Sequence, residues 1–379
     1  MTSTSPLSGF VVVELGHNVA GPVGGQILAE LGAKVVKVED PGKGDAARHW
    51  PPVVDGASMI YKALNRSKAG VTVDFTDADQ LAALKRLILD EADVVLQNLR
   101  PGVVERFGLD AETLRAEKPA LIYCNIGAYG AVGPMAGKPG YDVLMQGYAG
   151  LMSVQGEPDG PPMRAGSSIN DIGTGMWAAL SIQAALLERV RTGEGGVIDL
   201  SLYETGVSWI SIHLAAYMAT GVAEGKQGSG NAYITPYQAF KARDGHMMIG
   251  AANDVLFAKT ATVLERPDWI EDPRFVRNLD RVANRKVLVG LIEAELARDD
   301  VAAWVARFDA AGVPACPIRD VPEVANCPQT EALGLAQTAP DDPSVKLIGL
   351  PLSLDGERPP MRKSPPSLGR DNQAVFGRD

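Results

Sequence analysis

Asp171 is the residue whose type and setting most directly suggest chemistry, because a carboxylate at a helix start can be a cap or a reactive group. It stands in the run NDIGTG, residues 170–175, where apolar spacing predicts a helix that continues to Arg191. Asp is a preferred cap, worth about 1 kcal/mol. Gly173 and Gly175 each cost about 1 kcal/mol relative to Ala in a helix interior, and bare backbone there would let a bulky group approach the carboxylate. The residues alone leave both interpretations open.

A second pattern with chemical potential is the glycine-rich turn near the N-terminus. Gly21, Gly24 and Gly25, followed by Glu39 after the next predicted strand, partly match a nicotinamide-binding turn. The run GPVGG lacks the spacing GxGxxG, however, and Pro22 fits the first turn of a helix, where its missing N–H costs nothing. An NAD-linked dehydrogenase is therefore the less favoured interpretation. Neither a GxSxG nucleophile elbow nor a GxxxxGK[ST] phosphate loop occurs.

Charge and composition indicate which kinds of partner the protein can bind and in which compartment it is expected. The 379 residues carry 36 Lys and Arg against 46 Asp and Glu, a net charge of −10, which argues against nucleic acid or an anionic membrane as a partner. No apolar run reaches the ~18 residues of a membrane helix, and the N-terminus does not have the order of a secretory signal. Three cysteines without a CxxC pair suit a reducing cytosol, so we expect a cytoplasmic protein. Four histidines, none in ligand spacing, predict no metal site.

Short apolar strands alternate with helical segments in the first half of the chain, a pattern typical of an α/β fold. Such alternation predicts a doubly wound parallel sheet. The predicted strands are residues 10–15, 33–39, 70–75, 93–97, 121–127 and 197–202, and the main helices are 26–31, 77–88, 111–117 and 171–191.

The composition changes after Gly221, which predicts a second, smaller α+β domain with two strands hinged at Asp244 and Gly245. The predicted organisation is a large α/β domain beginning with residues 1–190, a linker at 191–224, the small domain at 225–315, a return linker at 316–335, and a C-terminal part at 336–379 that rejoins the large domain.

Segments in order along nearly the whole chain resemble the class III CoA-transferase family, which includes formyl-CoA transferase, carnitine CoA-transferase and the α-methylacyl-CoA racemases. No single motif carries the resemblance. The matching segments are 13–22 (VELGHNVAGP), 31–45 (LGAKVVKVEDPGKGD), 65–74 (NRSKAGVTVD), 97–109 (QNLRPGVVERFGL), 133–141 (GPMAGKPGY), 170–175 (NDIGTG), 236–245 (PYQAFKARDG), 281–285 (RVANR) and 311–317 (AGVPACP).

The resemblance implies an enzyme that moves CoA from an acyl-CoA to a carboxylic acid, with Asp171 as the catalytic aspartate. Its carboxylate would form a mixed anhydride and then an aspartyl-CoA thioester. Each step develops an oxyanion, for which the backbone amides at the start of the Asp171 helix and the glycine segment 225–230 are candidate donors. The resemblance also implies coenzyme A as part of the substrate and a homodimer of two interlocked chains.

The resemblance further implies a set of CoA contacts. CoA carries phosphates, so an acidic protein must supply local positive charge, and ligands of open α/β sheets bind at the carboxyl ends of the strands. For each cation in the set, solvated surface charge is an equally good interpretation. The implied contacts are His17, Val19, Ala20, Arg66, Lys68, Val73, Asn98, Arg100, Arg106, Lys138 and Tyr141.

The chain departs from the family at the nucleotide end of the implied site. Where formyl-CoA transferase carries a basic residue that contacts the nucleotide, this chain has Asp40. We therefore expect that contact to be absent or to come from Lys37, Lys43 or Arg48.

Tyr141 separates transfer from epimerisation. Racemases of the family need a histidine as a second base in this segment, and a tyrosine with a pKa of ~10 is a poor proton shuttle at neutral pH. The sequence therefore favours a CoA-transferase, with a racemase as the alternative. It does not name the donor or the acceptor acid.

Overall fold

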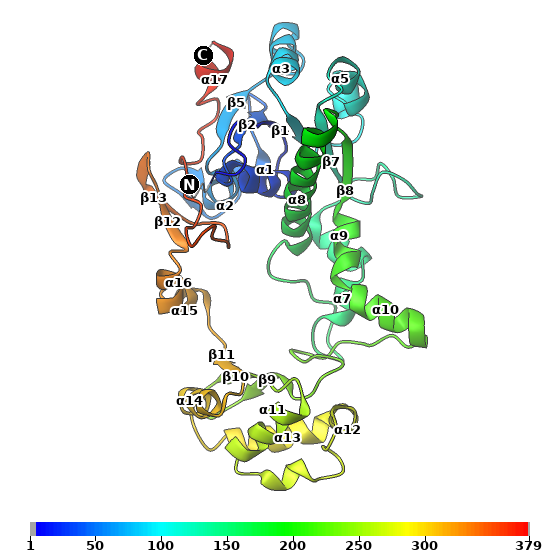
Figure 1. Cartoon of the computed structure of the whole chain (residues 1–379), viewed down its shortest axis with the longest axis vertical. Helices are drawn as coiled ribbons and strands as arrows, with labels where there is room; N and C mark the ends of the chain where they lie inside the picture. Colours follow the sequence, from blue (N-terminus) through cyan, green and yellow to red (C-terminus); the bar gives the residue numbers. More distant parts are fainter. Residues whose placement is uncertain (1–4, 378–379) are drawn as a thin grey trace. The chain divides into compact units, whose positions relative to one another are not determined.

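The chain divides into two compact units in the computed structural model, which describes residues 5–377 (Figure 1). The first, here called the sheet unit, comprises Met1–Gly150, Ala165–Ile210 and Pro328–Asp379. The second, the small unit, comprises Leu151–Arg164 and Ser211–Cys327. Within residues 5–377, no helix has the length and apolar composition needed to cross a membrane.

Six parallel strands form the central sheet of the sheet unit, which confirms the predicted α/β class and parallel sheet. They are β1 Val11–Leu15, β2 Lys34–Glu39, β5 Ala69–Thr72, β6 Val94–Gln97, β7 Ile122–Gly127 and β8 Val197–Ser201. Their order is β5-β2-β1-β6-β7-β8, so the chain starts in the middle and changes direction between β1 and β6. Open α/β sheets bind ligands at such a reversal, outside the carboxyl ends of the strands.

Helices and short hairpins complete the sheet unit. Its helices are α1 Ala20–Glu30, α2 Met59–Asn65, α3 Ala78–Asp90, α4 Val103–Arg106, α5 Ala111–Glu117, α6 Asp142–Tyr148, α8 Ile169–Thr192, α9 Leu202–Trp209, α16 Pro328–Ala332 and α17 Asn372–Phe376, with the 3-10 turn η1 Ala46–His49. Its hairpins are β3 Val53–Val54 with β4 Ala57–Ser58, and β12 Ala336–Ala339 with β13 Asp342–Ile348.

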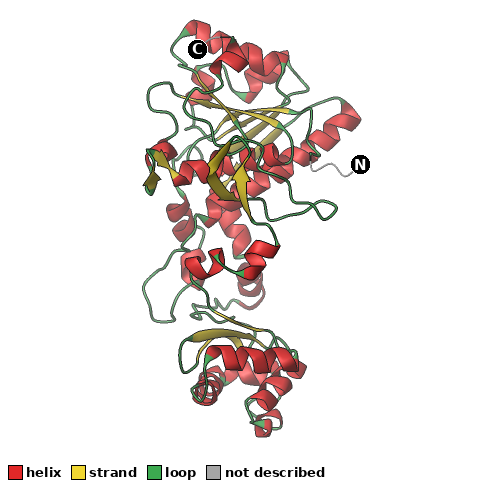
Figure 2. Ribbon diagram, turned by 90° about the vertical axis from the view of Figure 1, so that its left-hand side faces the viewer, coloured by secondary structure: helices red, strands yellow, loops and turns green. Residues whose placement is uncertain are grey.

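Apolar side chains that alternate along the strands bury both faces of the sheet under helices (Figure 2). Val12 and Val94 belong to a core that includes residues of α1 and α8. Val13 and Val95 face the other way, into a core that includes residues of α3 and α5. Because side chains alternate across a strand, one apolar run supplies both cores.

The C-terminal segment returns to the edge of the sheet. Asp371 Oδ2 accepts a hydrogen bond from the backbone N–H of Gly70 at 2.7 Å, and Asn372 Oδ1 accepts one from that of Thr72 at 2.8 Å. The edge strand β5 is thereby covered by the chain's own end, which prevents it from pairing with another strand.

The small unit has its own sheet and core. Its antiparallel sheet has the order β11-β10-β9, and the predicted hinge at Asp244 and Gly245 joins β9 to β10. Phe240, Trp269 and Phe308 are fully buried in its core. Its elements are α7 Leu151–Val154, α10 Ser211–Thr220, β9 Tyr237–Lys241, β10 His246–Gly250, α11 Asp254–Val263, η2 Pro267–Ile270, α12 Asn278–Ala283, α13 Arg285–Leu296, α14 Val301–Ala311, β11 Ala315–Pro317 and α15 Val321–Ala325.

The structure draws the unit boundaries differently from the sequence. Residues 197–209 of the predicted linker 191–224 instead form β8 and α9 of the sheet unit, because β8 pairs with β7 and completes the sheet. Residues 151–164, predicted for the large domain, belong to the small unit, and so do residues 316–327 of the predicted return linker. The sequence pattern predicts where helices and strands lie, but the contacts between them decide to which unit each belongs.

Candidate active site

Asp171 is the third residue of α8 and does not cap it. The N-cap is Ser168, whose side chain makes no capping hydrogen bond. A carboxylate from another helix takes that place: Asp142 Oδ1 accepts from the backbone N–H of Asn170 at 2.8 Å and of Asp171 at 3.4 Å. The interpretation of Asp171 as a helix cap is therefore wrong, and its side chain carries out no capping role.

Asp142 is itself held in place. It is the first residue of α6 and is buried, and its Oδ2 accepts a hydrogen bond from Gln146 Nε2 at 2.6 Å. Gln146 Oε1 in turn accepts from the backbone N–H of Ala165 at 2.7 Å. The N-terminus of α8, where a negative charge is stabilised, is thus occupied by a fixed carboxylate from α6.

The electrostatics at Asp171 follow from this neighbour. The side chain is half-buried, and burial raises its pKa to about 7, with the Asp142 carboxylate adding to the effect. Both influences disfavour the charged form. The result is a carboxylate that is poorly solvated, forms no salt bridge with any described residue, and titrates close to neutral pH.

Gly173 and Gly175 are explained by helix packing, and the prediction that they let a bulky group reach Asp171 is wrong. A Cβ on Gly173 would lie 2.5 Å from Trp209 Cζ2 of α9. A Cβ on Gly175 would lie 2.7 Å from the carbonyl oxygen of Ala20, at the start of α1. The glycines allow α9 and α1 to contact α8 closely, which brings the starts of α8 and α1 together.

The predicted oxyanion donors at the start of α8 are also corrected. The amides of Asn170 and Asp171 donate to Asp142, and that of Ile172 donates to the carbonyl of Ser168 at 2.9 Å. These donors are already engaged. The glycine segment 225–230 lies in the small unit, and its role as a donor stays a prediction.

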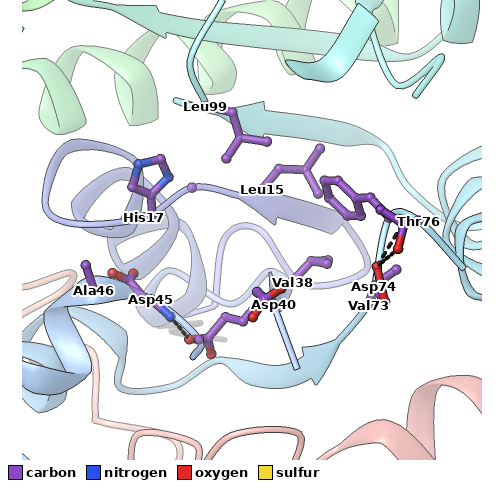
Figure 3. Close-up of a pocket in the computed structure, with 14 residues that line it drawn as sticks. Leu15, His17, Val38, Asp40, Asp45, Ala46, Val73, Asp74, Thr76 and Leu99 are labelled. Atoms are coloured by element: carbon purple, nitrogen blue, oxygen red, sulfur yellow. Dashed lines mark hydrogen bonds between the residues drawn. The ribbon is translucent and has the colours of Figure 1, made fainter. Parts of the chain in front are cut away.

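A cavity of about 390 Å³ lies at the carboxyl ends of β1, β2, β5 and β6, at the reversal of the strand order (Figure 3). His17 and Val73, two of the predicted CoA contacts, line it. So does Asp40, the residue at which the chain departs from the family. The full lining is Leu15, Gly16, His17, Val38, Glu39, Asp40, Gly44, Asp45, Ala46, Val73, Asp74, Phe75, Thr76 and Leu99.

Sequence reasoning missed Val38, Phe75 and Leu99 as lining residues. Val38 lies near the end of β2, and Phe75 and Leu99 follow β5 and β6, so the rule that ligands bind at the carboxyl ends of strands could have identified them. Apolar residues at strand ends have the same sequence pattern as core residues, so the pattern alone does not mark them as lining a cavity. Their presence gives the cavity an apolar wall as well as a polar rim.

His17 is half-buried at the rim of this cavity, in the loop between β1 and α1. Burial lowers the pKa of its imidazole; Asp45 opposes this, while Lys37 and Arg100 lower it further. The ring is therefore neutral at physiological pH. A neutral imidazole can donate one hydrogen bond and accept another.

Arg66 and Lys68 are not available to a phosphate, so their prediction as CoA contacts is wrong. The Arg66 guanidinium pairs with Glu30, and both side chains are buried. Lys68 Nζ is fully buried and lies 2.7 Å from Glu14 Oε2, and it donates to the carbonyl of Pro22 at 2.8 Å. Their charges neutralise internal carboxylates, which the sequence could not distinguish from surface charge.

Asn98 is half-buried, and its contact with CoA stays a prediction. Its Oδ1 accepts from the backbone N–H of His17 at 2.8 Å, and its Nδ2 donates to the carbonyl of His17 at 2.9 Å. Both polar groups of the side chain therefore bind the backbone of the loop. Val19 and Ala20 are buried at the start of α1, so a contact to CoA would have to come from their backbone.

The other predicted contacts lie exposed on the surface of the sheet unit, Arg106 at the end of α4 and the rest on loops, and they stay predictions. Arg100 and Arg106 follow β6, while Lys138 and Tyr141 precede α6. Of the cations suggested to compensate for Asp40, Lys37 is fully buried in ion pairs and Arg48 pairs with Glu39. Only Lys43 is exposed, and it is the remaining candidate for that contact.

The glycines of α1 serve packing as well. A Cβ on Gly25 would lie 1.8 Å from Glu14 Oε2, and one on Gly24 would lie 3.2 Å from the carbonyl oxygen of Gly175. Pro22 lies in the first turn of α1, as predicted. The turn is therefore built to pack α1 on the sheet and on α8. Among residues 5–377, no group of three His, Cys, Asp or Glu side chains is placed to hold a metal ion.

This parallel-sheet fold, with its cavity and half-buried carboxylate, belongs to a known family of enzymes. The sequence model of CoA-transferase family III matches residues 7–372, and the chain is a member of that family. It is 36% identical to acetyl-CoA:oxalate CoA-transferase of Acetobacter aceti, over 98% of this chain and 95% of the relative. It is also 36% identical to succinyl-CoA:glutarate CoA-transferase of Mus musculus, over 99% of this chain and 86% of the relative.

Solved structures agree with this assignment. The crystal structure of a CAIB/BAIF family protein from Brucella suis matches with a TM-score of 0.87 at 36% identity, over 99% of both chains. The chain is thus a class III CoA-transferase that uses CoA thioesters as substrates. The dehydrogenase interpretation is wrong, since its glycine turn has the packing role described above.

Proposed function

We propose that Asp171 is the nucleophile of this CoA-transferase and carries first the acyl group and then CoA. The observation that supports this most is a half-buried carboxylate beside a second carboxylate, Asp142, with its pKa raised to about 7. A poorly solvated carboxylate is a better nucleophile toward a thioester than a solvated one. The position also matches the family's catalytic aspartate in the segment NDIGTG.

The proposed reaction proceeds through two covalent intermediates. Asp171 Oδ attacks the thioester carbonyl, the C–S bond breaks, and CoA leaves as a thiolate, giving a mixed anhydride. The thiolate attacks the aspartyl carbonyl and releases the first acid, leaving an aspartyl-CoA thioester. The acceptor carboxylate then attacks this thioester, and the thiolate returns to the acyl carbon of the new anhydride. Acyl-CoA leaves, and Asp171 is regenerated.

The cavity is proposed to hold the nucleotide end of CoA. It lies at the reversal of the strand order, where open sheets take such ligands, and its apolar wall suits a base. Lys43, Arg100, Arg106 and Lys138 are the exposed cations proposed to contact the phosphates. The starts of α1 and α8 pack together through Gly175, so CoA would run from the cavity along the His17 loop toward Asp171.

The acceptor is proposed to be a short dicarboxylic acid. The relatives are named for oxalate in Acetobacter aceti, and for succinate and glutarate in Mus musculus and Agrobacterium fabrum. A panel of acyl-CoA donors against free acids would identify the pair. A racemase remains a less favoured alternative, since Tyr141 stands where a racemase needs histidine.

The enzyme is proposed to act as an interlocked homodimer in the cytoplasm. Helix α10 has no buried residue, and Ile212 and Met218 are 69% and 78% exposed; on α8, Leu187 is 71% exposed. Exposed apolar side chains of this kind, on either unit, are typical of surfaces that bind another subunit. The cysteines of the described chain are free thiols, as expected in a reducing compartment.

The decisive test is mass spectrometry of the intact enzyme, quenched during turnover with an acyl-CoA donor. We expect an adduct that maps to Asp171 and becomes a hydroxamate with hydroxylamine. Asp171→Asn should give none. Asp110→Asn is the matched control, because Asp110 is a half-buried carboxylate that caps α5, and it should keep the adduct. An adduct on another residue, or none with a donor that turns over, would refute the proposal. Deuterium exchange at the α-carbon of a 2-methylacyl-CoA would instead favour the racemase.

A further inference from the structure

The backbone of His17 is bound across the reversal of the strand order by one side chain, Asn98. This residue follows β6, and its amide accepts from the N–H of His17 and donates to its C=O, at 2.8 and 2.9 Å. The amide is enclosed as well: a Cβ on Gly21 would lie 3.2 Å from Asn98 Oδ1. Asn98 thus ties the loop after β1 to the loop after β6, at the carboxyl ends of two paired strands.

The two residues that flank His17 are held from the opposite side. Lys37 Nζ donates to the carbonyl of Gly16 at 2.7 Å and to Asp45 Oδ2 at 2.9 Å, and both side chains are fully buried. Asp45 Oδ1 accepts from the backbone N–H of Asn18 at 3.0 Å. Asn18 has a φ of 62°, a left-handed conformation that costs free energy for a residue other than glycine and that this bond supports.

We propose that Asn98, Lys37 and Asp45 are positioning residues that fix the loop 16–18 so that His17 faces bound CoA. Together they bind every backbone polar group from the carbonyl of Gly16 to the N–H of Asn18. The imidazole of His17 is then the polar group of this residue left to face the cavity that it lines (Figure 3). The inference rests on the proposed function, because it takes this cavity as the CoA site.

The physical reason is preorganisation. A loop that is already ordered does not lose conformational entropy when the ligand binds, so breaking one tie should weaken binding. Removing Asn98 frees both polar groups of the His17 backbone at once. We expect Asn98→Ala to raise the Kd for CoA, measured by calorimetry, about tenfold and to raise KM for the acyl-CoA similarly, with kcat changed less than about threefold.

Gln337 offers a matched control in the same unit. Its amide makes the same pair of contacts to backbone, since Nε2 donates to the carbonyl of Pro359 at 3.0 Å and Oε1 accepts from the N–H of Met361 at 2.7 Å. It does not line the cavity. Gln337→Ala should lower the melting temperature as Asn98→Ala does, yet leave Kd and KM within about twofold.

A spectroscopic readout separates positioning from stability. The chain has four histidines, so ¹³C-labelled histidine gives a simple NMR titration in which His17→Gln assigns the signal of His17. The ring is held buried near Lys37 and Arg100, and Asn98→Ala should release it and move its pKa up toward the ordinary value of 6.5. Gln337→Ala should leave it in place. If Asn98→Ala does not fold, Asn98→Asp, which keeps the acceptor for the His17 N–H, replaces it.

Two outcomes would overturn the inference. One is a loss of stability in Asn98→Ala with unchanged Kd, KM and His17 titration, which would make the tie purely structural. The other is a shifted His17 titration with unchanged Kd and KM, which would mean that the loop does not serve CoA. Neither depends on whether Asp171 is acylated, so failure here and failure of the proposed mechanism are distinguishable.

Discussion

The sheet unit contains two groups of charged side chains that are shielded from solvent. In one group each carboxylate is paired with a cation, and in the other it is not. Under the cavity, Glu14, Asp45 and Glu39 are matched by Lys37, Lys68 and Arg48 within 3.2 Å. At the start of α8, the carboxyl groups of Asp171 and Asp142 lie close enough to interact, and neither forms a salt bridge within residues 5–377.

The pKa directions express this difference. Burial alone lowers the pKa of Lys37, but Glu14, Asp45 and Glu39 outweigh it, and the net pKa is raised, so the charge is permanent. Asp171, with burial and a like charge, has its pKa raised to about 7 and sits between its two forms at neutral pH. A buried charge with an opposite partner, such as Lys37, holds a loop in place. A shielded carboxylate without one, such as Asp171, has a perturbed pKa of the kind that favours a role in chemistry.

Removing the unbalanced carboxylate should have the largest effect. We expect Asp171→Ala to lower kcat by at least about a thousandfold, since no neighbouring group replaces the nucleophile. CoA affinity should stay within roughly tenfold, because the carboxylate acts mainly in chemistry. Steady-state kinetics and calorimetry measure both. Substantial remaining transferase activity would mean that Asp171 is not the nucleophile.

Removing a balancing charge should act on stability instead. Lys37→Met leaves Glu14 and Asp45 buried without their partner, which costs about 3–5 kcal/mol in comparable cases. Lys34→Met is the control on the same strand: it removes an exposed pair with Glu91, worth less than about 1 kcal/mol. Denaturant unfolding compares them. Equal losses would mean that burial of the pair does not matter.

The pH profile tests Asp171 without removing it. Because the nucleophile must be ionised, kcat/KM for the acyl-CoA should rise about tenfold from pH 6 to pH 8, with a midpoint near 7. Asp142→Asn keeps a side-chain oxygen for the start of α8 but removes the like charge, so the midpoint should move to lower pH. A midpoint that stays in place would show that burial alone sets the pKa.

The raised pKa of Asp171 also predicts a cost in stability. Its pKa in the folded state exceeds the ordinary value of 3.8, so the folded protein binds the proton more tightly and loses stability as pH rises from about 4 to 7. Asp171→Asn removes this cost, so it should raise the melting temperature by roughly 2–5 °C at pH 8 and by less at pH 5. A gain independent of pH would point to packing.

Arg106 belongs to neither group and should give the smallest effect. Its side chain is exposed, and its guanidinium lies 5.0 Å from the ring of Phe107. Arg106→Ala should raise KM for CoA thioesters about three- to tenfold with little change in kcat, the pattern of uniform binding. Lys85→Ala, away from the cavity, is the control. Selective loss of kcat would assign Arg106 to chemistry.

The sequence by itself determined the class of fold and the segment that holds Asp171, the proposed nucleophile. Alternating apolar strands and helices are local patterns, and they located all six strands of the parallel sheet to within a few residues. The family segments supplied Asp171, and the chain's membership of the family is established. Such signals survive without a structure because they depend on neighbours along the chain.

Only the tertiary structure decided what the polar residues do. Asn98 and His17 are 81 positions apart, and Arg66 and Glu30 are 36 apart, so nothing local distinguishes a tie or a buried pair from a ligand contact. The same holds for Asp142 at the start of α8. The sequence does not show whether a charged residue is surrounded by solvent, by a ligand or by another charge. Its partner is determined only when the sheet and its helices pack together.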